Sequence, residues 1–150
     1  MKNLLIVLIL SCTNLTSCVS TKSTLKNVDD TTPIPTLSKN NSFVFTQFSA
    51  DKKYGYDKDY PINVFYKSTA NETINQQRFL DALTGPKGEK LTYSKIGICC
   101  PFPTKNNPSG SGLLDEYEIK WEGLATPILL YFNIYEKGVL MVPVGLGLKK

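Results

Sequence analysis

Three distinct patterns of hydrophobic and polar residues follow one another along the chain. An unbroken apolar run of seven residues begins at Leu4, residues 19–42 are mostly Ser, Thr, Lys, Asn and Pro, and aromatic and β-branched residues recur at short intervals from Phe43 onward. A segment as polar as 19–42 buries too little apolar surface to offset its ordering entropy. The predicted organisation is a leader at 1–17, a flexible tether at 18–42 and a globular domain at 43–150. A chain that begins near Asn41 is therefore expected to fold as well as the longer one.

Within the predicted domain, an alternation with a period of two indicates strands, and one segment has the period of a helix. The helix is expected over residues 73–83, where Thr73 and Gln76 match a capping box. Strands are expected at 43–48, 62–66, 90–100 and 117–122, with two more within 127–145 around a turn at 136–138. The predicted fold class is α+β, an antiparallel sheet of about five to six strands with one short helix against one face.

Two departures from simple alternation add detail to the predicted sheet. The apolar alternation slips between Tyr93 and Ile96, which predicts a β-bulge near Lys95 or Gly97. The first strand expected within 127–145 is apolar on both faces, which predicts a central position in the sheet.

The first eighteen residues have the features of an export signal. Lys2 precedes the apolar run, which is too short to cross the roughly 30 Å hydrocarbon layer of a membrane as a helix. The sequence LTSC at residues 15–18 then resembles the lipobox of bacterial lipoproteins, and this resemblance implies that Cys18 becomes the lipidated N-terminus. The alternative ILSC at 9–12 places the bulky Leu10 where a small residue is usual. An ordinary secreted protein with a chance cysteine is a further alternative.

Lipidation would attach an otherwise soluble domain to a membrane. Each buried methylene contributes about 0.8 kcal/mol, so two or three acyl chains make release negligible. Val19 follows the cysteine where an Asp would resemble an inner-membrane retention signal. We therefore expect a cell-envelope protein attached to the outer membrane by its lipid anchor.

Charge and composition exclude several functional classes. The 150-residue chain has a formal net charge of +4 and contains no histidine, and Arg78 is its only arginine. Clustered arginines are typical of nucleic-acid and phosphate sites, so nucleic acid is not an expected partner. Without histidine, Ser-His-Asp catalysis, Cys-His catalysis and imidazole-bound zinc are excluded. We expect no cofactor and no metal.

Cys99 and Cys100 are adjacent, and after lipidation of Cys18 they would be the only thiols of the processed chain. In an oxidising envelope they could be structural thiols, a vicinal disulfide, or a pair that bonds a metal, a redox partner or another chain. Neighbouring Cα atoms lie about 3.8 Å apart, below the roughly 4.4 Å at which disulfides usually begin. Strand conformation would also point the two side chains to opposite faces. Structural thiols are therefore the favoured expectation, and a vicinal disulfide would need a distorted turn.

An acidic and aromatic group is the candidate for ligand binding. By alternation Asp115, Tyr117 and Trp121 share one face of a strand. Aromatic faces stack on sugar rings, and a carboxylate accepts hydrogen bonds from their hydroxyls. The alternative is that Asp115 is a strand-start acid that reaches solvent or caps a turn.

The segments "YGYDKDYPI", "RFLDALTGPKGEK", "ICCPF", "GLLDEYEI" and "LLYFNIYEKG", within about residues 54–145, resemble a group of small bacterial lipoproteins without an established activity. Some members carry the name 2-dehydro-3-deoxyphosphooctonate aldolase. That enzyme is a (β/α)₈ barrel of roughly 250 residues, which this chain is too short to form, so the resemblance implies no catalytic residue. The sequence thus predicts a non-catalytic domain that binds an envelope protein or a glycan, or has a structural role. The alternative is an enzyme, either that aldolase or one dependent on the thiols of Cys99 and Cys100.

Overall fold

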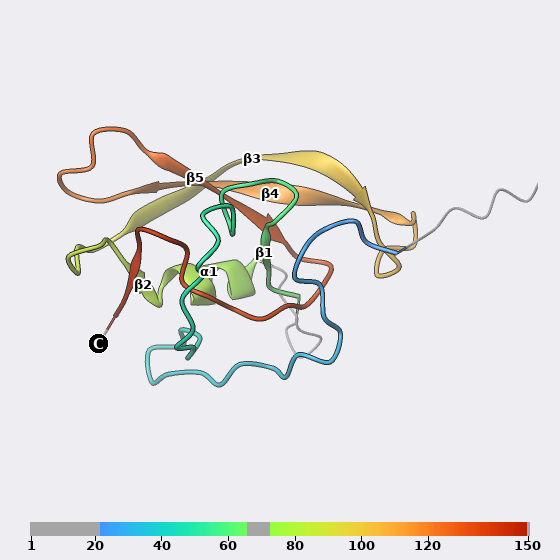
Figure 1. The fold of residues 1–150 in the computed structure, drawn as a ribbon, viewed down its shortest axis with the longest axis horizontal. Coiled ribbons are helices and arrows are strands. Elements are labelled where there is room, and N and C mark those ends of the chain that lie inside the picture. The colour runs from blue at the N-terminus through green and yellow to red at the C-terminus, as the bar shows by residue number, and fades with distance from the viewer. Residues whose placement is uncertain (1–21, 66–72, 150) are drawn as a thin grey trace, which may run out of the picture.

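The computed structural model describes residues 22–65 and 73–149. In this part of the chain, strands predominate and one short helix is present, in agreement with the expected mixture of α and β structure. The elements in chain order are β1 (Ile62–Asn63), α1 (Ile74–Leu80), β2 (Leu83–Thr84), β3 (Thr92–Pro103), β4 (Ser111–Lys120), β5 (Ile128–Asn133) and β6 (Gly147–Leu148). Figure 1 shows the larger sheet as one layer, with α1 packed against one of its faces.

The larger sheet has four strands in the order β1-β5-β4-β3, and β2 pairs with β6 in a separate antiparallel pair. The expected single antiparallel sheet of five to six strands is therefore wrong, because β1 runs parallel to β5. The hairpin expected within 127–145 does not form. Only its first strand, β5, is present, and it lies between β1 and β4, which confirms its predicted central position.

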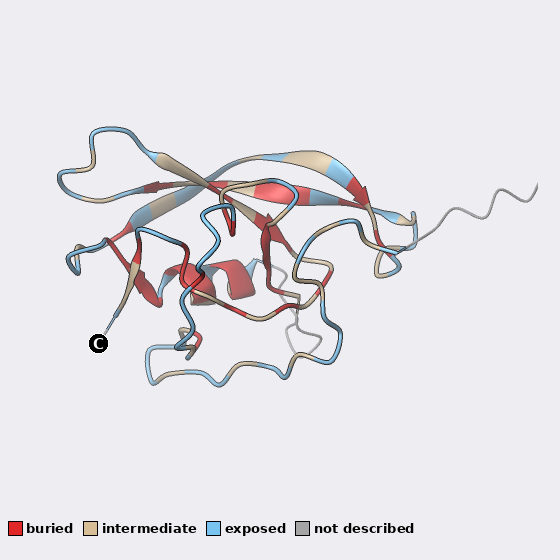
Figure 2. Ribbon diagram, viewed as in Figure 1, coloured by how far each residue is buried: buried red, intermediate tan, exposed pale blue. Residues whose placement is uncertain are grey.

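The helix is shorter than the expected 73–83, and its capping box is absent. Thr73 is the N-cap residue but makes no side-chain capping bond. Gln76 is fully buried and bonds side chains of β4 instead of the start of its own helix. Phe79 and Leu80 belong to the main hydrophobic core together with Leu130 and other sheet residues. Figure 2 shows most of α1 in the red of buried residues.

The segment 43–48 has no regular strand, although alternation predicts one. It makes only single bridges, Phe43 to Leu37 and Phe48 to Val142. Arg78, the only arginine, holds this region to α1 because its guanidinium donates to the side-chain oxygens of Asn41 and Asn75. The arginine therefore has a structural role.

The predicted β-bulge is confirmed. The pairing of β3 with β4 shifts register between Lys95 and Gly97, and a second shift lies between Cys99 and Phe102. At this second shift Cys100 and Pro101 together oppose the single residue Leu113, because Cys99 pairs with Leu114 and Phe102 with Gly112. β3 therefore contains an extra residue at the position of the two cysteines.

Residues 22–42 differ most from their sequence-based expectation. Instead of forming a free tether, this segment is hydrogen-bonded to the domain: the Lys26 N–H donates to the Asp59 carbonyl and the Asp29 N–H to the Lys137 carbonyl, each at 2.9 Å. The expected tether at 18–42 is thus wrong for its described part, and residues 18–21 lie outside the described residues. Polar composition misled the prediction because main-chain groups, rather than apolar side chains, hold the segment.

The leader at 1–17 and Cys18 also lie outside the described residues. Across residues 22–65 and 73–149, no helix has the length and apolar character needed to span a membrane.

Candidate functional site

Cys99 and Cys100 form a disulfide bond with each other, with their Cα atoms 3.7 Å apart. The favoured expectation of two structural thiols is therefore wrong, and one of its alternatives is observed. The required distortion comes from the backbone, because Cys100 has a φ of 57° and lies in the second register shift of β3. This left-handed conformation costs a non-glycine residue roughly 1–2 kcal/mol. It turns the Cys100 side chain away from its place in a regular strand.

The disulfide has little capacity to stabilise the fold by crosslinking. In the chain-entropy description, a disulfide restricts the unfolded chain less as the loop that it closes becomes shorter. A bond between neighbouring residues closes the shortest loop possible and joins no two distant parts of the chain. The bond therefore contributes little to the stability of the fold, although it holds Cys100 in a conformation that is costly for cysteine.

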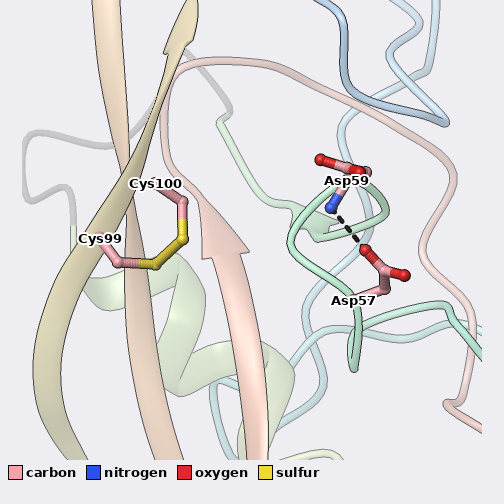
Figure 3. Close-up of a disulfide and its surroundings, with 4 residues drawn as sticks. All are labelled: Asp57, Asp59, Cys99 and Cys100. Carbon is pink, nitrogen blue, oxygen red and sulfur yellow. Dashed lines mark hydrogen bonds between the residues drawn. A yellow bond between two sulfur atoms is a disulfide. The ribbon is translucent and has the colours of Figure 1, made fainter.

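The disulfide borders a hollow of about 140 Å³ on the surface of the domain. Cys100 lines it from β3, Thr24 and Leu25 from the N-terminal segment, and Lys58 and Asp59 from a turn. Both cysteines are partly exposed. Figure 3 shows the two sulfur atoms projecting from β3 on the side of the turn that carries Asp57 and Asp59.

The Asp57 carboxylate stabilises that turn by contacts within the turn itself. The Asp57 carboxylate accepts the Asp59 N–H at 2.9 Å and pairs with Lys53 at 3.4 Å. The hydrogen bond from the Asp59 backbone, helped by the nearby ammonium group of Lys53, lowers the pKa of Asp57. Asp57 thus stays ionised and engaged within the turn, and Lys58 is the cationic side chain that lines the hollow beside Cys100.

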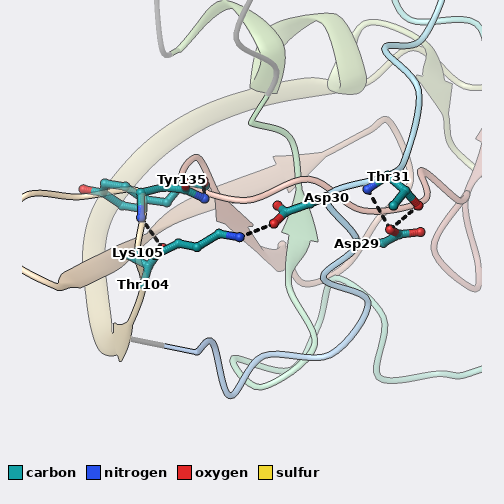
Figure 4. A network of polar contacts seen from close by, with 7 residues as sticks. Asp29, Asp30, Thr31, Thr104, Lys105 and Tyr135 are labelled. Atoms are coloured by element: carbon teal, nitrogen blue, oxygen red, sulfur yellow. Dashed lines mark hydrogen bonds and ion pairs between the residues drawn. The ribbon is translucent and has the colours of Figure 1, made fainter. Parts of the chain in front are cut away.

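A second, larger hollow of about 450 Å³ adjoins the first at the N-terminal segment, since Leu25 lines both. Its other walls include Lys22, Val28, Asp30, Lys105 and Glu136. Lys105 reaches across from the loop after β3 to form an ion pair with Asp30, as Figure 4 shows. The hydrogen bond to Asp30 raises the pKa of Lys105.

Glu136 is the most distinctive group of the larger hollow. Its residue is only 3% exposed, and one carboxylate oxygen accepts a hydrogen bond from the Asn133 side chain at 3.1 Å. Asn133 also donates to Asn63 at 2.9 Å, and Asn63 donates to the main-chain oxygens of Lys26 and Asn27. A buried amide network thus links the carboxylate to the N-terminal segment. The second oxygen of the carboxylate can accept a hydrogen bond from a ligand.

The residues predicted to bind a ligand have different surroundings. Asp115 and Tyr117 share a face, as predicted, but that face is buried: Gln76 donates to Asp115 at 2.6 Å and accepts from the Tyr117 hydroxyl at 2.9 Å. Lys95 completes the group with an ion pair to Asp115 at 2.7 Å. Burial raises the pKa of Tyr117 to about 12. Trp121 is partly buried and packs against the core. We therefore assign Asp115 and Tyr117 to a core network.

No sequence pattern marks Glu136, Lys105 or Asp30 as site residues. Asp30 lies in the predicted tether and Glu136 in a predicted turn, so both were expected to face solvent. The three meet only because the N-terminal segment folds back on the domain. The described residues include no group of three or more metal-ligating side chains placed to hold an ion.

Comparisons with protein-family models, with curated proteins and with solved structures find no match for this chain. Its function is therefore inferred from its own residues and geometry.

Proposed function

We propose that this protein is a lipid-anchored component of the bacterial cell envelope, attached to the outer membrane, whose domain binds an envelope protein or a glycan without catalysis. The observation that carries the proposal is the lipobox-like LTSC at residues 15–18 after a short apolar run. The disulfide between Cys99 and Cys100 supports it, because disulfides persist in oxidising compartments outside the cytoplasm.

The packing of the N-terminal segment limits how far the hollow can lie from a lipid at Cys18. Only four residue steps separate Cys18 from Lys22, and an extended chain spans at most about 3.6 Å per residue, so the lipid would lie within roughly 14 Å of Lys22. Lys22 lines the 450 Å³ hollow. An anchor at Cys18 would therefore hold this hollow close to the membrane surface.

The polar groups of the hollow support a binding role. The Glu136 carboxylate oxygen that accepts no hydrogen bond from the described residues can accept one from a hydroxyl or an N–H group of a ligand. The ion pair of Asp30 with Lys105, which lines the same hollow, offers a further acceptor and donor. Leu25 and Val28 add an apolar wall. A sugar or a polar peptide segment presents matching groups.

An enzymatic function has less support. Cys99 and Cys100 are bonded to each other, so neither is a free nucleophile. The described residues contain six strands and one helix, without the alternating helices that the aldolase barrel requires.

Replacement of the anchoring cysteine tests the proposed location. Cys18→Ala should abolish lipidation, and the protein should accumulate uncleaved or be recovered from the aqueous phase in detergent partitioning. Cys12→Ala is the matched control, because it removes the alternative lipobox while leaving LTSC intact. If the Cys18→Ala protein is still processed and partitions into detergent, the proposed anchor is wrong.

The binding role is tested at Glu136. Cross-linking in intact envelopes should capture a glycan or protein partner with the native chain, and Glu136→Gln should reduce the yield about five- to tenfold, because loss of a charged acceptor costs about 1–1.5 kcal/mol. The exposed Glu122→Gln is the control and should leave the yield unchanged. Equal capture by both variants would exclude the hollow as the binding site.

A further inference from the structure

We propose that the Cys99–Cys100 disulfide is a thiol–disulfide exchange site that accepts two electrons from a dithiol, either a small molecule or a protein. This inference is independent of the lipid anchor and of the ligand bound near Glu136. It rests on the backbone at the bond, the access to it and the charge beside it.

The backbone favours reduction of this bond. Neighbouring residues joined by a trans peptide hold their Cα atoms 3.7 Å apart, below the range in which disulfides are relaxed, and no peptide bond of the described residues is cis. Cys100 also has a left-handed backbone conformation that cysteine rarely adopts. After reduction, nothing ties the Cys100 side chain to Cys99, so the residue can leave that conformation. Strained disulfides are the ones that are readily reduced.

The position of the bond permits attack. Both cysteines are partly exposed, and Cys100 opens onto the 140 Å³ hollow. Exchange requires a thiolate to approach one sulfur atom while the other sulfur leaves. A bond buried in the core would prevent this approach, whereas a bond at the rim of a surface hollow permits it.

The charge beside Cys100 favours an anionic nucleophile. Lys58 lines the same hollow as Cys100, and a cationic residue there favours the approach of an anionic thiolate to the Cys100 sulfur. Asp59 lines this hollow as well and opposes the effect, while Asp57 is paired with Lys53. Among the described residues that line the hollow, Lys58 is thus the one cation and Asp59 the one anion.

The reaction balances as two successive exchanges. The thiolate of the dithiol attacks the Cys100 sulfur, a mixed disulfide forms, and the Cys99 thiolate leaves and takes up a proton. The second thiol of the dithiol then loses its proton and attacks the first dithiol sulfur, which is bonded to Cys100 in the mixed disulfide. This attack releases the Cys100 thiolate, which takes up a proton. The dithiol is oxidised to a disulfide, and the cysteine pair receives two electrons and two protons.

The test uses the chain with Cys12→Ser and Cys18→Ser, purified in detergent, in which Cys99 and Cys100 are the only cysteines, so that its outcome does not depend on the lipid anchor. The folded protein is incubated with increasing concentrations of dithiothreitol, quenched with acid and alkylated, and the number of labels per chain is measured by mass spectrometry. A stable secreted protein whose disulfides close long loops is the reference in the same tube. We expect no labels without dithiothreitol. Two labels should appear at a dithiothreitol concentration at least tenfold lower than the one that reduces the reference protein, and one dithiol should be oxidised per chain.

Two results would overturn the proposal. Two labels without reductant would mean that no disulfide is present. A pair that stays oxidised until the reference is reduced would mean that the bond is inert in the folded protein.

A double variant separates exchange from folding. Cys99→Ser with Cys100→Gly keeps a residue at position 100 that accepts a left-handed backbone, so the protein should fold and melt within a few degrees of the native chain. It should oxidise no dithiol. Dithiol oxidation equal to that of the native chain would place the activity elsewhere and overturn the assignment.

Discussion

A chain that begins at Asn41 should melt roughly 10 °C or more below one that begins at Lys22, a loss of about 2–4 kcal/mol in the free energy of unfolding. The reason is the main chain of the N-terminal segment. Its removal deletes the bonds of Lys26 to Asp59 and of Asp29 to Lys137. It also deletes both main-chain acceptors of the Asn63 side chain, a residue with no exposed surface.

The buried side chain of Asn63 is the main reason why this truncation should lower the free energy of unfolding. Asn63 also accepts a hydrogen bond from Asn133, which in turn donates to Glu136. Loss of the segment therefore opens one end of a buried polar network, and a buried donor without a partner costs about 1–3 kcal/mol. Gly138 shows how closely the segment packs, because a Cβ atom there would overlap the Asn27 carbonyl oxygen.

The measurement is thermal unfolding followed by circular dichroism, with a third chain as control. A chain that begins at Leu25 retains every hydrogen bond named above and should melt with the longer one. If the Asn41 chain melts within about 2 °C of the Lys22 chain, the segment contributes nothing to stability and the tether prediction would stand after all.

Gln76→Ala should destabilise the domain by about 3–5 kcal/mol, a large fraction of the roughly 5–15 kcal/mol by which an ordinary domain is stable. The Gln76 side chain is fully buried, and it serves the Asp115 carboxylate and the Tyr117 hydroxyl together. Alanine leaves a cavity, removes a donor from a carboxylate that is only 4% exposed and removes the acceptor of a buried hydroxyl.

Gln77 provides a matched control on the same helix. It has the same side chain but is exposed, so Gln77→Ala should change the free energy of unfolding by less than about 0.5 kcal/mol. Urea unfolding of both variants measures the difference directly. Equal losses would mean that the core network of Asp115, Tyr117 and Gln76 does not stabilise the fold.

Local patterns explain the parts of the fold that could be predicted. The β-bulge near Lys95 and the central position of β5 both follow from which residues are apolar on which face, and this depends only on neighbours in the sequence. The helix was predicted for the same reason, since its apolar residues have helical spacing. The capping box does not form, because the Gln76 side chain bonds Asp115 of β4 instead of the first turn of its own helix. The spacing of Thr73 and Gln76 in the sequence is the same in both cases, so it could not distinguish them.

The site was harder to predict because its groups come from distant parts of the chain. The adjacency of Cys99 and Cys100 identified the cysteines, but their oxidation state depends on a second bulge that alternation did not reveal. Asp115 lies on the predicted face of its strand. The Gln76 amide that binds it is 39 residues away in the sequence, so the pattern of the strand gave no sign of it. Glu136 gave no signal, since the sequence Glu136-Lys137-Gly138 is typical of an exposed turn.

Residue type and local order are enough to establish the absence of histidine chemistry, the lipobox-like LTSC, the strand-rich domain and the adjacency of its two cysteines. Three other features appear only in the folded chain: β1 lies parallel to β5, the N-terminal segment packs on the domain, and Glu136 is buried. They depend on main-chain hydrogen bonds and buried amides between segments far apart in the chain. Almost any residue can supply a main-chain bond, so such contacts leave no pattern in the sequence.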